Sequence, residues 1–170
     1  LLNSAKIATQ GSLRAALIRR TSDPENIRAC FYNDAGQASM FDLTNTFVIA
    51  SGNMAVGLSS TNLYVLCQTN GMFPIVQEYR LGSYSTLPTN AVFVYETSCG
   101  DSNSVNGEIL QLVSGGIAVV VSQQTNEHEF HITYRNDSGT WATSGKTNFG
   151  GFISGSQPAN HFSMAQHPAD

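Results

Sequence analysis

The chain has few charged residues and few cysteines, and it has no long hydrophobic run. Charged residues make up 12% of its 170 residues, which is about half the share usual in soluble proteins. The formal net charge is −4, and lysine occurs only at Lys6 and Lys146. Nucleic-acid binding requires many cations that neutralise phosphates, so this composition argues against a nucleic-acid partner.

One small basic group near the N-terminus is interrupted by the acidic residues Asp23 and Glu25. Its members are Arg14, Arg19, Arg20 and Arg28. Phosphate-binding surfaces present a continuous basic patch. We therefore expect no nucleic acid here, and we keep open a capsid protein whose basic arm lies outside this sequence.

The three cysteines, Cys30, Cys67 and Cys99, lie far apart, and none belongs to a CxxC pair. This sparse, odd number argues against a disulfide framework and against a zinc site. We interpret them as buried free thiols, with a single disulfide left open. No apolar run approaches the roughly 18 residues of a membrane span, so we expect no membrane insertion. Because the chain begins at Leu1 without a methionine, we expect it to be part of a longer or processed polypeptide.

What the sequence does contain is a succession of short strand patterns separated by turn signals. In residues 108–146, three turn signals separate four runs rich in β-branched and aromatic residues, which predicts a β-meander. The same pattern through the chain predicts roughly 10–12 short strands, no significant helix and no internal repeat. We expect one all-β domain over residues 1–170, an antiparallel β-sandwich or jelly roll. Residues 1–12 form its lead-in segment and residues 155–170 an irregular C-terminal tail.

Several segments give more specific expectations. Residues 13–20 (LRAALIRR) are compatible with a helix or a strand, whereas 27–31 alternate and predict one apolar face made of Ile27, Ala29 and Phe31. Residues 91–96 are apolar on both faces, which predicts a central strand. Pro74 cannot donate to a ladder, so residues 72–79 are predicted to form an edge strand or to be bulged there.

Residues 130–135 alternate between apolar and polar side chains. The pattern predicts that Phe130, Ile132 and Tyr134 face the core and that His131, Thr133 and Arg135 face water. Residues three apart on a strand point to opposite faces, so His128 and His131 should not share a metal ion. His161 and His167 match no ligand spacing. We therefore predict no metal site.

No catalytic motif stands out. There is no GxSxG elbow for a Ser-His-Asp hydrolase and no glycine-rich phosphate loop between a strand and a helix. Paired carboxylates for glycoside hydrolysis would have to come from a small set: Asp101, Glu108, Glu127 and Glu129. We predict no catalytic residues, no cofactor and no enzymatic activity.

Residues 54–66 (MAVGLSSTNLYVL) and 161–166 (HFSMAQ) suggest a family. The first is similar to the G-L-containing repeats of adenovirus-type fibre shafts, and the second to the FSYIAQ-like ending of those fibres. The head-opening TLWT motif of mammalian adenovirus fibres is absent. The chain thus resembles the C-terminal head, or knob, of a viral fibre or phage tail fibre.

The resemblance implies a homotrimeric head on the virion surface that binds a host-cell glycan or protein receptor. We expect such binding at two polar hairpin tips, at residues 135–141 and 80–86. The candidate receptor-binding residues are Arg135, Asn136, Ser138, Trp141, Arg80 and Tyr84. Asn136-Asp137-Ser138 is also a glycosylation sequon, although turn residues alone explain it. Trp141 is expected to be either a core anchor or a stacking platform.

Two alternatives from other classes remain open at this point. One is a structural capsid or decoration jelly roll, which would bind its neighbours. The other is an extracellular carbohydrate-binding module or glycosidase, for which Glu127 and Glu129 would be the first carboxylates to test.

Overall fold

The structure, a computed structural model, describes residues 7–19, 27–44, 55–67, 73–100, 104–123 and 129–148. These residues form twelve β-strands and no helix, which confirms the all-β prediction. The strands are β1 (Ile7–Gln10), β2 (Leu13–Arg19), β3 (Ile27–Asn33), β4 (Ala38–Asp42), β5 (Ala55–Leu58), β6 (Asn62–Cys67), β7 (Ile75–Leu81), β8 (Ala91–Ser98), β9 (Ser104–Gln111), β10 (Ile117–Gln123), β11 (Glu129–Arg135) and β12 (Trp141–Asn148). Within the described ranges, no helix is long and apolar enough to cross a membrane.

The strands form three four-stranded antiparallel sheets, each a plain meander of consecutive strands. Sheet A contains β1–β4, sheet B contains β5–β8 and sheet C contains β9–β12. Their first strands begin at Ile7, Ala55 and Ser104, that is, 48 and 49 residues apart. A structural repeat therefore exists where none was predicted. The three segments repeat the meander, and Asn-Asp-x-Gly recurs in the β3–β4 and β11–β12 turns at residues 33–36 and 136–139, a match too short to have predicted the repeat.

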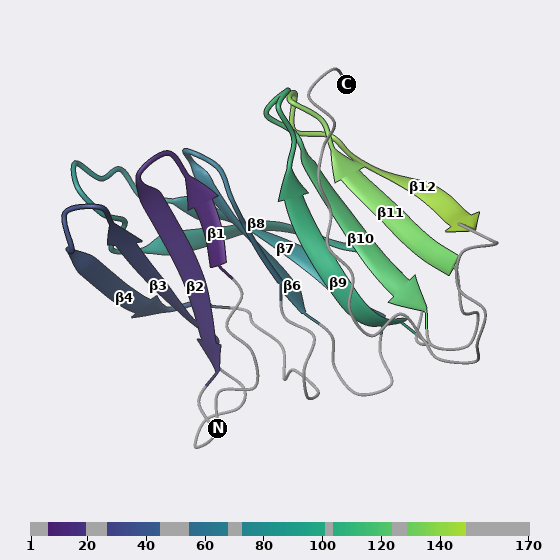
Figure 1. The fold of residues 1–170 in the computed structure, drawn as a ribbon, viewed down its shortest axis with the longest axis horizontal. Helices are drawn as coiled ribbons and strands as arrows, with labels where there is room; N and C mark the ends of the chain where they lie inside the picture. The colour runs from purple at the N-terminus through teal and green to yellow at the C-terminus, as the bar shows by residue number, and fades with distance from the viewer. Residues whose placement is uncertain are drawn as a thin grey trace.

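The sheets pack face to face in three layers, with sheet B in the middle (Figure 1). Strand β5 lies against β1 and β2 on one side and against β9 on the other. The core between sheets A and B includes Leu17, Phe31 and Leu63, and the core between B and C includes Leu66 and Val119. Burying each such side chain contributes about 1.5–3 kcal/mol, so both layers of contact stabilise the stack.

Sheet A follows the alternation of its sequence. The segment that was ambiguous between helix and strand is β2, with Leu13, Ala15 and Leu17 buried against sheet B. The predicted face of β3 is confirmed, because Ile27, Ala29 and Phe31 are all buried. Strand β1 lies within the predicted lead-in segment, and its Ala8 packs against the core between sheets A and B.

Two expectations for sheet B are wrong. Strand β8 is the edge of the sheet rather than a central strand, and Val92, Val94 and Tyr95 on it are exposed. Strand β7 lies between β6 and β8 rather than at the edge, and its register shift against β8 falls between Glu78 and Tyr79 rather than at Pro74. Pro74 is compatible with this position because it precedes the strand, where its carbonyl oxygen accepts a hydrogen bond from the Cys99 N–H at 2.9 Å.

Three hairpin turns share one geometry, and each needs a glycine. They span residues 33–37, 112–116 and 136–140. In each, the first residue's N–H donates to the fifth residue's carbonyl oxygen, and the fourth residue's N–H donates to the first residue's carbonyl oxygen. The fourth residue is Gly36, Gly115 or Gly139, with φ of 77°, 96° and 91°. Only glycine adopts these angles without strain, which is why these turn signals were readable in the sequence.

The hairpin turns that follow the odd-numbered strands gather at one end of the stack (Figure 1). We call this the hairpin end. Contacts across sheets agree with this arrangement. The Ser39 hydroxyl, beside the β3–β4 turn, donates to the Pro88 carbonyl oxygen in the β7–β8 connection. The Tyr84 hydroxyl donates to the Ser60 carbonyl oxygen in the β5–β6 turn at 3.1 Å. The fold thus brings turns from all three sheets to one surface.

Candidate functional site

The predicted receptor-binding residues lie at the hairpin end, on two different sheets. Arg135 is the last residue of β11, Asn136 and Ser138 belong to the following turn, and Trp141 is the first residue of β12. Arg80 lies in β7 and Tyr84 in the connection to β8. Because sheet C packs on sheet B, Arg135 and Trp141 reach a buried carboxylate on β7, the strand that contains Arg80.

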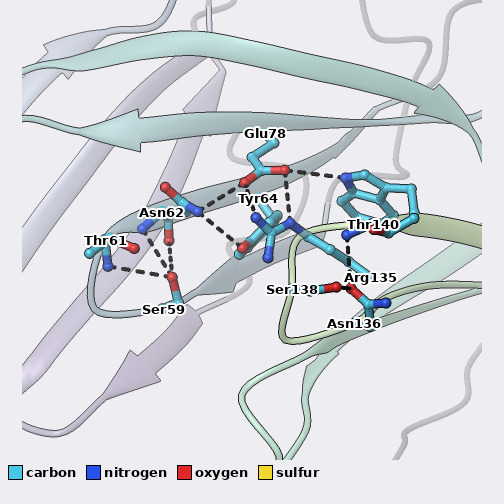
Figure 2. Close-up of polar contacts among 10 residues, drawn as sticks. Ser59, Thr61, Asn62, Tyr64, Glu78, Arg135, Asn136, Ser138 and Thr140 are labelled. Atoms are coloured by element: carbon cyan, nitrogen blue, oxygen red, sulfur yellow. Dashed lines mark hydrogen bonds and ion pairs between the residues drawn. The ribbon is translucent and has the colours of Figure 1, made fainter.

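That carboxylate is Glu78, and it accepts four hydrogen bonds (Figure 2). Its Oε1 accepts from Asn62 Nδ2 at 2.9 Å and from Arg135 Nη2 at 2.9 Å. Its Oε2 accepts from Arg135 Nε at 3.0 Å and from Trp141 Nε1 at 3.2 Å. The Arg135 guanidinium therefore binds the carboxylate through two parallel hydrogen bonds, a geometry that makes such an ion pair strong and directional. We call these four residues the Glu78 cluster.

The Tyr64 ring packs against two members of the Glu78 cluster, Arg135 and Trp141. The Arg135 guanidinium lies 5.8 Å from the centre of its ring, and Trp141 meets the ring edge-on with centroids 6.2 Å apart. Burial raises the pKa of the Tyr64 hydroxyl above its ordinary value. Of the two roles expected for Trp141, the structure shows the core anchor, since its ring packs against the core between sheets B and C.

The face prediction for β11 is wrong, and the Glu78 cluster explains why. Thr133 is fully buried and Arg135 points toward sheet B, whereas Tyr134 is 42% exposed. The register with β10 pairs Val119 with Thr133 and Ile117 with Arg135, which sets them on the face that packs against sheet B. Sheet B presents a carboxylate there, so a cation on β11 is more favourable in that place than an apolar side chain.

The β11–β12 turn is exposed and fixed by its own side chains. Asn136 Oδ1 accepts from the Thr140 N–H at 2.8 Å and from the Ser138 hydroxyl at 2.7 Å. A Cβ on Gly139 would lie 3.1 Å from Arg135 Nη2. Asn136 and Ser138 themselves are exposed. The turn is thus held in one conformation next to the Glu78 cluster, and the sequon it carries faces solvent.

The exposed part of the site on sheet B includes residues that the sequence did not single out. Arg80 is exposed, and its cross-strand neighbours are Asn62 and Val92. Tyr95 pairs with Glu78 across the ladder and lies exposed at the sheet edge. Tyr84, in contrast, is half-buried against the core between sheets A and B. Glu78, Val92 and Tyr95 were missed because their positions follow from strand pairing.

Most of the remaining candidate residues for catalysis or metal binding lie outside the described residues. His131 is half-buried on the face turned toward sheet B, and His128 lies outside the described residues. Asp101, Glu127 and the side chain of Glu129 also lie outside them, as do His161 and His167. Glu108 is half-buried on β9. Among the residues whose placement is described, no group of three or more His, Cys, Asp or Glu is arranged to hold a metal ion.

Two arginines of the small basic group are neutralised within sheet A, and the cysteines are not joined by disulfides. Arg14 pairs with Asp34, and Arg28 pairs with Asp42 through two bonds at 2.6 and 2.9 Å. None of the three cysteines forms a disulfide, and Cys67 and Cys99 are buried, as predicted. Cys30 is half-buried.

No protein-family model matches this chain, and no curated protein sequence matches it. Its role must therefore be argued from the hairpin end itself. That surface presents a fixed turn and an exposed arginine beside the Glu78–Arg135 ion pair, and the exposed Tyr95 lies farther along β8, opposite Glu78.

Proposed function

We propose that this chain is a non-catalytic attachment module that binds a glycan through its hairpin end. The carrying observation is that the tip at residues 135–141 bonds to β7, the strand that leads into the other tip. Arg135 of one tip bonds to Glu78, 57 residues earlier, two positions before Arg80 of the other. A fixed surface of this kind loses little conformational entropy on binding, which favours affinity.

The chemistry of the exposed groups supports a carbohydrate ligand. Sugars are recognised by hydrogen bonds from amide, hydroxyl and guanidinium groups and by an aromatic ring that covers an apolar sugar face. Asn136 supplies an amide and Ser138 a hydroxyl. Arg80 supplies the guanidinium, and Tyr95 supplies the aromatic ring. Arg135 and Trp141 are positioning residues, because their polar atoms bond to Glu78.

The resemblance to fibre heads suggests where such glycan binding would take place. A fibre head at the virion surface attaches a virus or phage to a host-cell receptor, and a glycan on that cell would be the ligand of the hairpin end. The resemblance also implies a homotrimer, a stoichiometry that the mass of the protein in solution tests. Several copies would multiply weak single-site contacts through avidity.

A glycan array probed with the wild-type chain and with an Arg80→Ala/Tyr95→Ala variant tests the proposal. We expect the wild type to bind a set of related glycans and the variant to lose about tenfold or more in affinity for them. Phe73→Ala is the matched control, because Phe73 is exposed and lies two residues before β7, away from the hairpin end. Equal binding by wild type and the double variant, or no binding to any glycan, would contradict the proposal.

A further inference from the structure

The face of sheet A that points away from sheet B carries a row of apolar side chains. Ile7, Ala16, Cys30 and Met40 are cross-strand neighbours, one from each strand of the sheet. Ile7 is 57% and Met40 59% exposed, and the two residues between them are half-buried. We call this the outer row of sheet A.

Ion pairs border the outer row of sheet A on both sides. Arg28 and Asp42 form a two-bond pair in the neighbouring cross-strand row, and Arg14 pairs with Asp34 on the other side. An apolar centre within a polar rim is the usual anatomy of a protein–protein interface. Exposed apolar groups with such a rim commonly mark interaction sites.

The stack itself shows what kind of surface fits there. Each contact within it joins the face of one sheet to the opposite face of the next, A to B and B to C. The outer face of sheet A is in the position where a preceding sheet would pack. The outer face of sheet C is in the position where a following sheet would pack, and it too has an apolar cross-strand row. That row consists of Leu110, Ala118, Tyr134 and Ala142.

We propose that two copies of this chain associate head to tail, with the outer row of sheet A of each copy packed on the outer face of sheet C of the other. This continues the packing already present within each copy. It does not depend on the proposed glycan binding. Two identical contacts would form at once, so the second becomes intramolecular and strengthens the first.

The number of copies follows from the arrangement of the strands. The first strands β1, β5 and β9 are consecutive neighbours, whereas β4 and β12 lie at the two flanks (Figure 1). Four-stranded meanders with adjacent first strands are the blades of β-propellers, which typically close with about four to eight blades. Three sheets per copy give six in two copies and nine in three. Two copies therefore close a ring of ordinary size, unlike the homotrimer that the fibre resemblance implies.

Light scattering after size exclusion, over about 5–200 µM of the 170-residue chain, tests this inference. We expect a mass of about 36 kDa, twice the 18.2 kDa of one chain. Met40→Arg should raise the dissociation constant by roughly a hundredfold, because the contact would bury an unpaired charge. Val113→Arg is the matched control, since Val113 is an exposed apolar residue at a turn tip, and it should leave the mass unchanged.

Cys30 reports on the same contact, because its thiol lies in the outer row of sheet A. Its reaction with a disulfide reagent should slow as the wild-type concentration rises and should be fast at all concentrations in Met40→Arg. A monomer at 200 µM would overturn the inference, as would a trimer near 55 kDa or an open polymer. A monomer in which Cys30 is nevertheless unreactive would also overturn it, because the row would then be covered within one copy.

Discussion

Replacing Glu78 with glutamine perturbs the buried Glu78–Arg135 ion pair, which joins sheets B and C. Each carboxylate oxygen accepts two hydrogen bonds, from donors on Asn62, Arg135 and Trp141. Glutamine has the same shape, but its NH₂ group would meet donors instead of donating to acceptors. The charge of Arg135 would also lose its partner.

The size of the effect follows from burial. The side chains of Glu78 and Arg135 are 5% and 16% exposed, so water can replace little of the lost interaction. Breaking a buried pair from one side costs about 3–5 kcal/mol. Whole domains are stable by only about 5–15 kcal/mol, so Glu78→Gln should remove a large fraction of the total. The double variant Glu78→Gln/Arg135→Met should lose less than the sum of the two single variants, because the unpaired charge is gone.

Urea unfolding measures this directly. Trp141 is the only tryptophan of the chain and bonds to Glu78, so its fluorescence reports the site, and far-UV circular dichroism reports the sheets. The matched control is Asp42→Asn, the same change in a pair whose carboxylate is 54% exposed. That control should cost about 1 kcal/mol or less. If Glu78→Gln costs no more than Asp42→Asn, the argument for a buried clamp is refuted.

Three further predictions concern stability. Thr133 Oγ1 is buried and has no hydrogen-bond partner in the part of the chain that is described. Thr133→Val should therefore raise the free energy of unfolding by about 1 kcal/mol and Tm by about 2–4 °C, whereas a lower Tm would mean that the hydroxyl has a partner. Gly139→Ala should lower the free energy of unfolding by about 1–2 kcal/mol, because φ is 91° and the new Cβ would meet Arg135. An unchanged midpoint in urea would contradict that strain. Burial raises the pKa of Cys99 and Tyr79 above their ordinary values, so these groups lose their protons first in the unfolded chain. Their contribution to stability is constant below about pH 8 and should fall above about pH 9. Urea unfolding from about pH 7 to about pH 11 measures this. Tyr79→Phe should reduce the slope of stability against pH above about pH 10, and a flat profile for the wild type would contradict the prediction.

The sequence predicted those features that depend on neighbouring residues. Alternation identified the buried face of β3 at Ile27, Ala29 and Phe31, and glycine identified the turns at Gly36 and Gly139. The structure confirms these because the strand period and the left-handed φ of a turn are local properties.

The sequence did not predict those features that depend on a residue in another sheet. β10 is apolar on both faces and does not show which face of β11 is buried. The deciding residue, Glu78, is 57 residues away from Arg135 and 63 from Trp141. In the same way, apolar residues on both faces of β8 suggested a central strand, although the meander ends there. Two polar tips of the candidate site were predicted, whereas the bonds from one tip to Glu78 and the exposed position of Tyr95 depend on how strands and sheets pair.

The most direct test of the account is to locate where a glycan selected by the array binds. Amide NMR spectra recorded during its titration should shift at Arg80, Tyr95 and Asn136 and remain unchanged at Phe73. Shifts confined to residues away from the hairpin end would contradict the central claim, whatever the affinity.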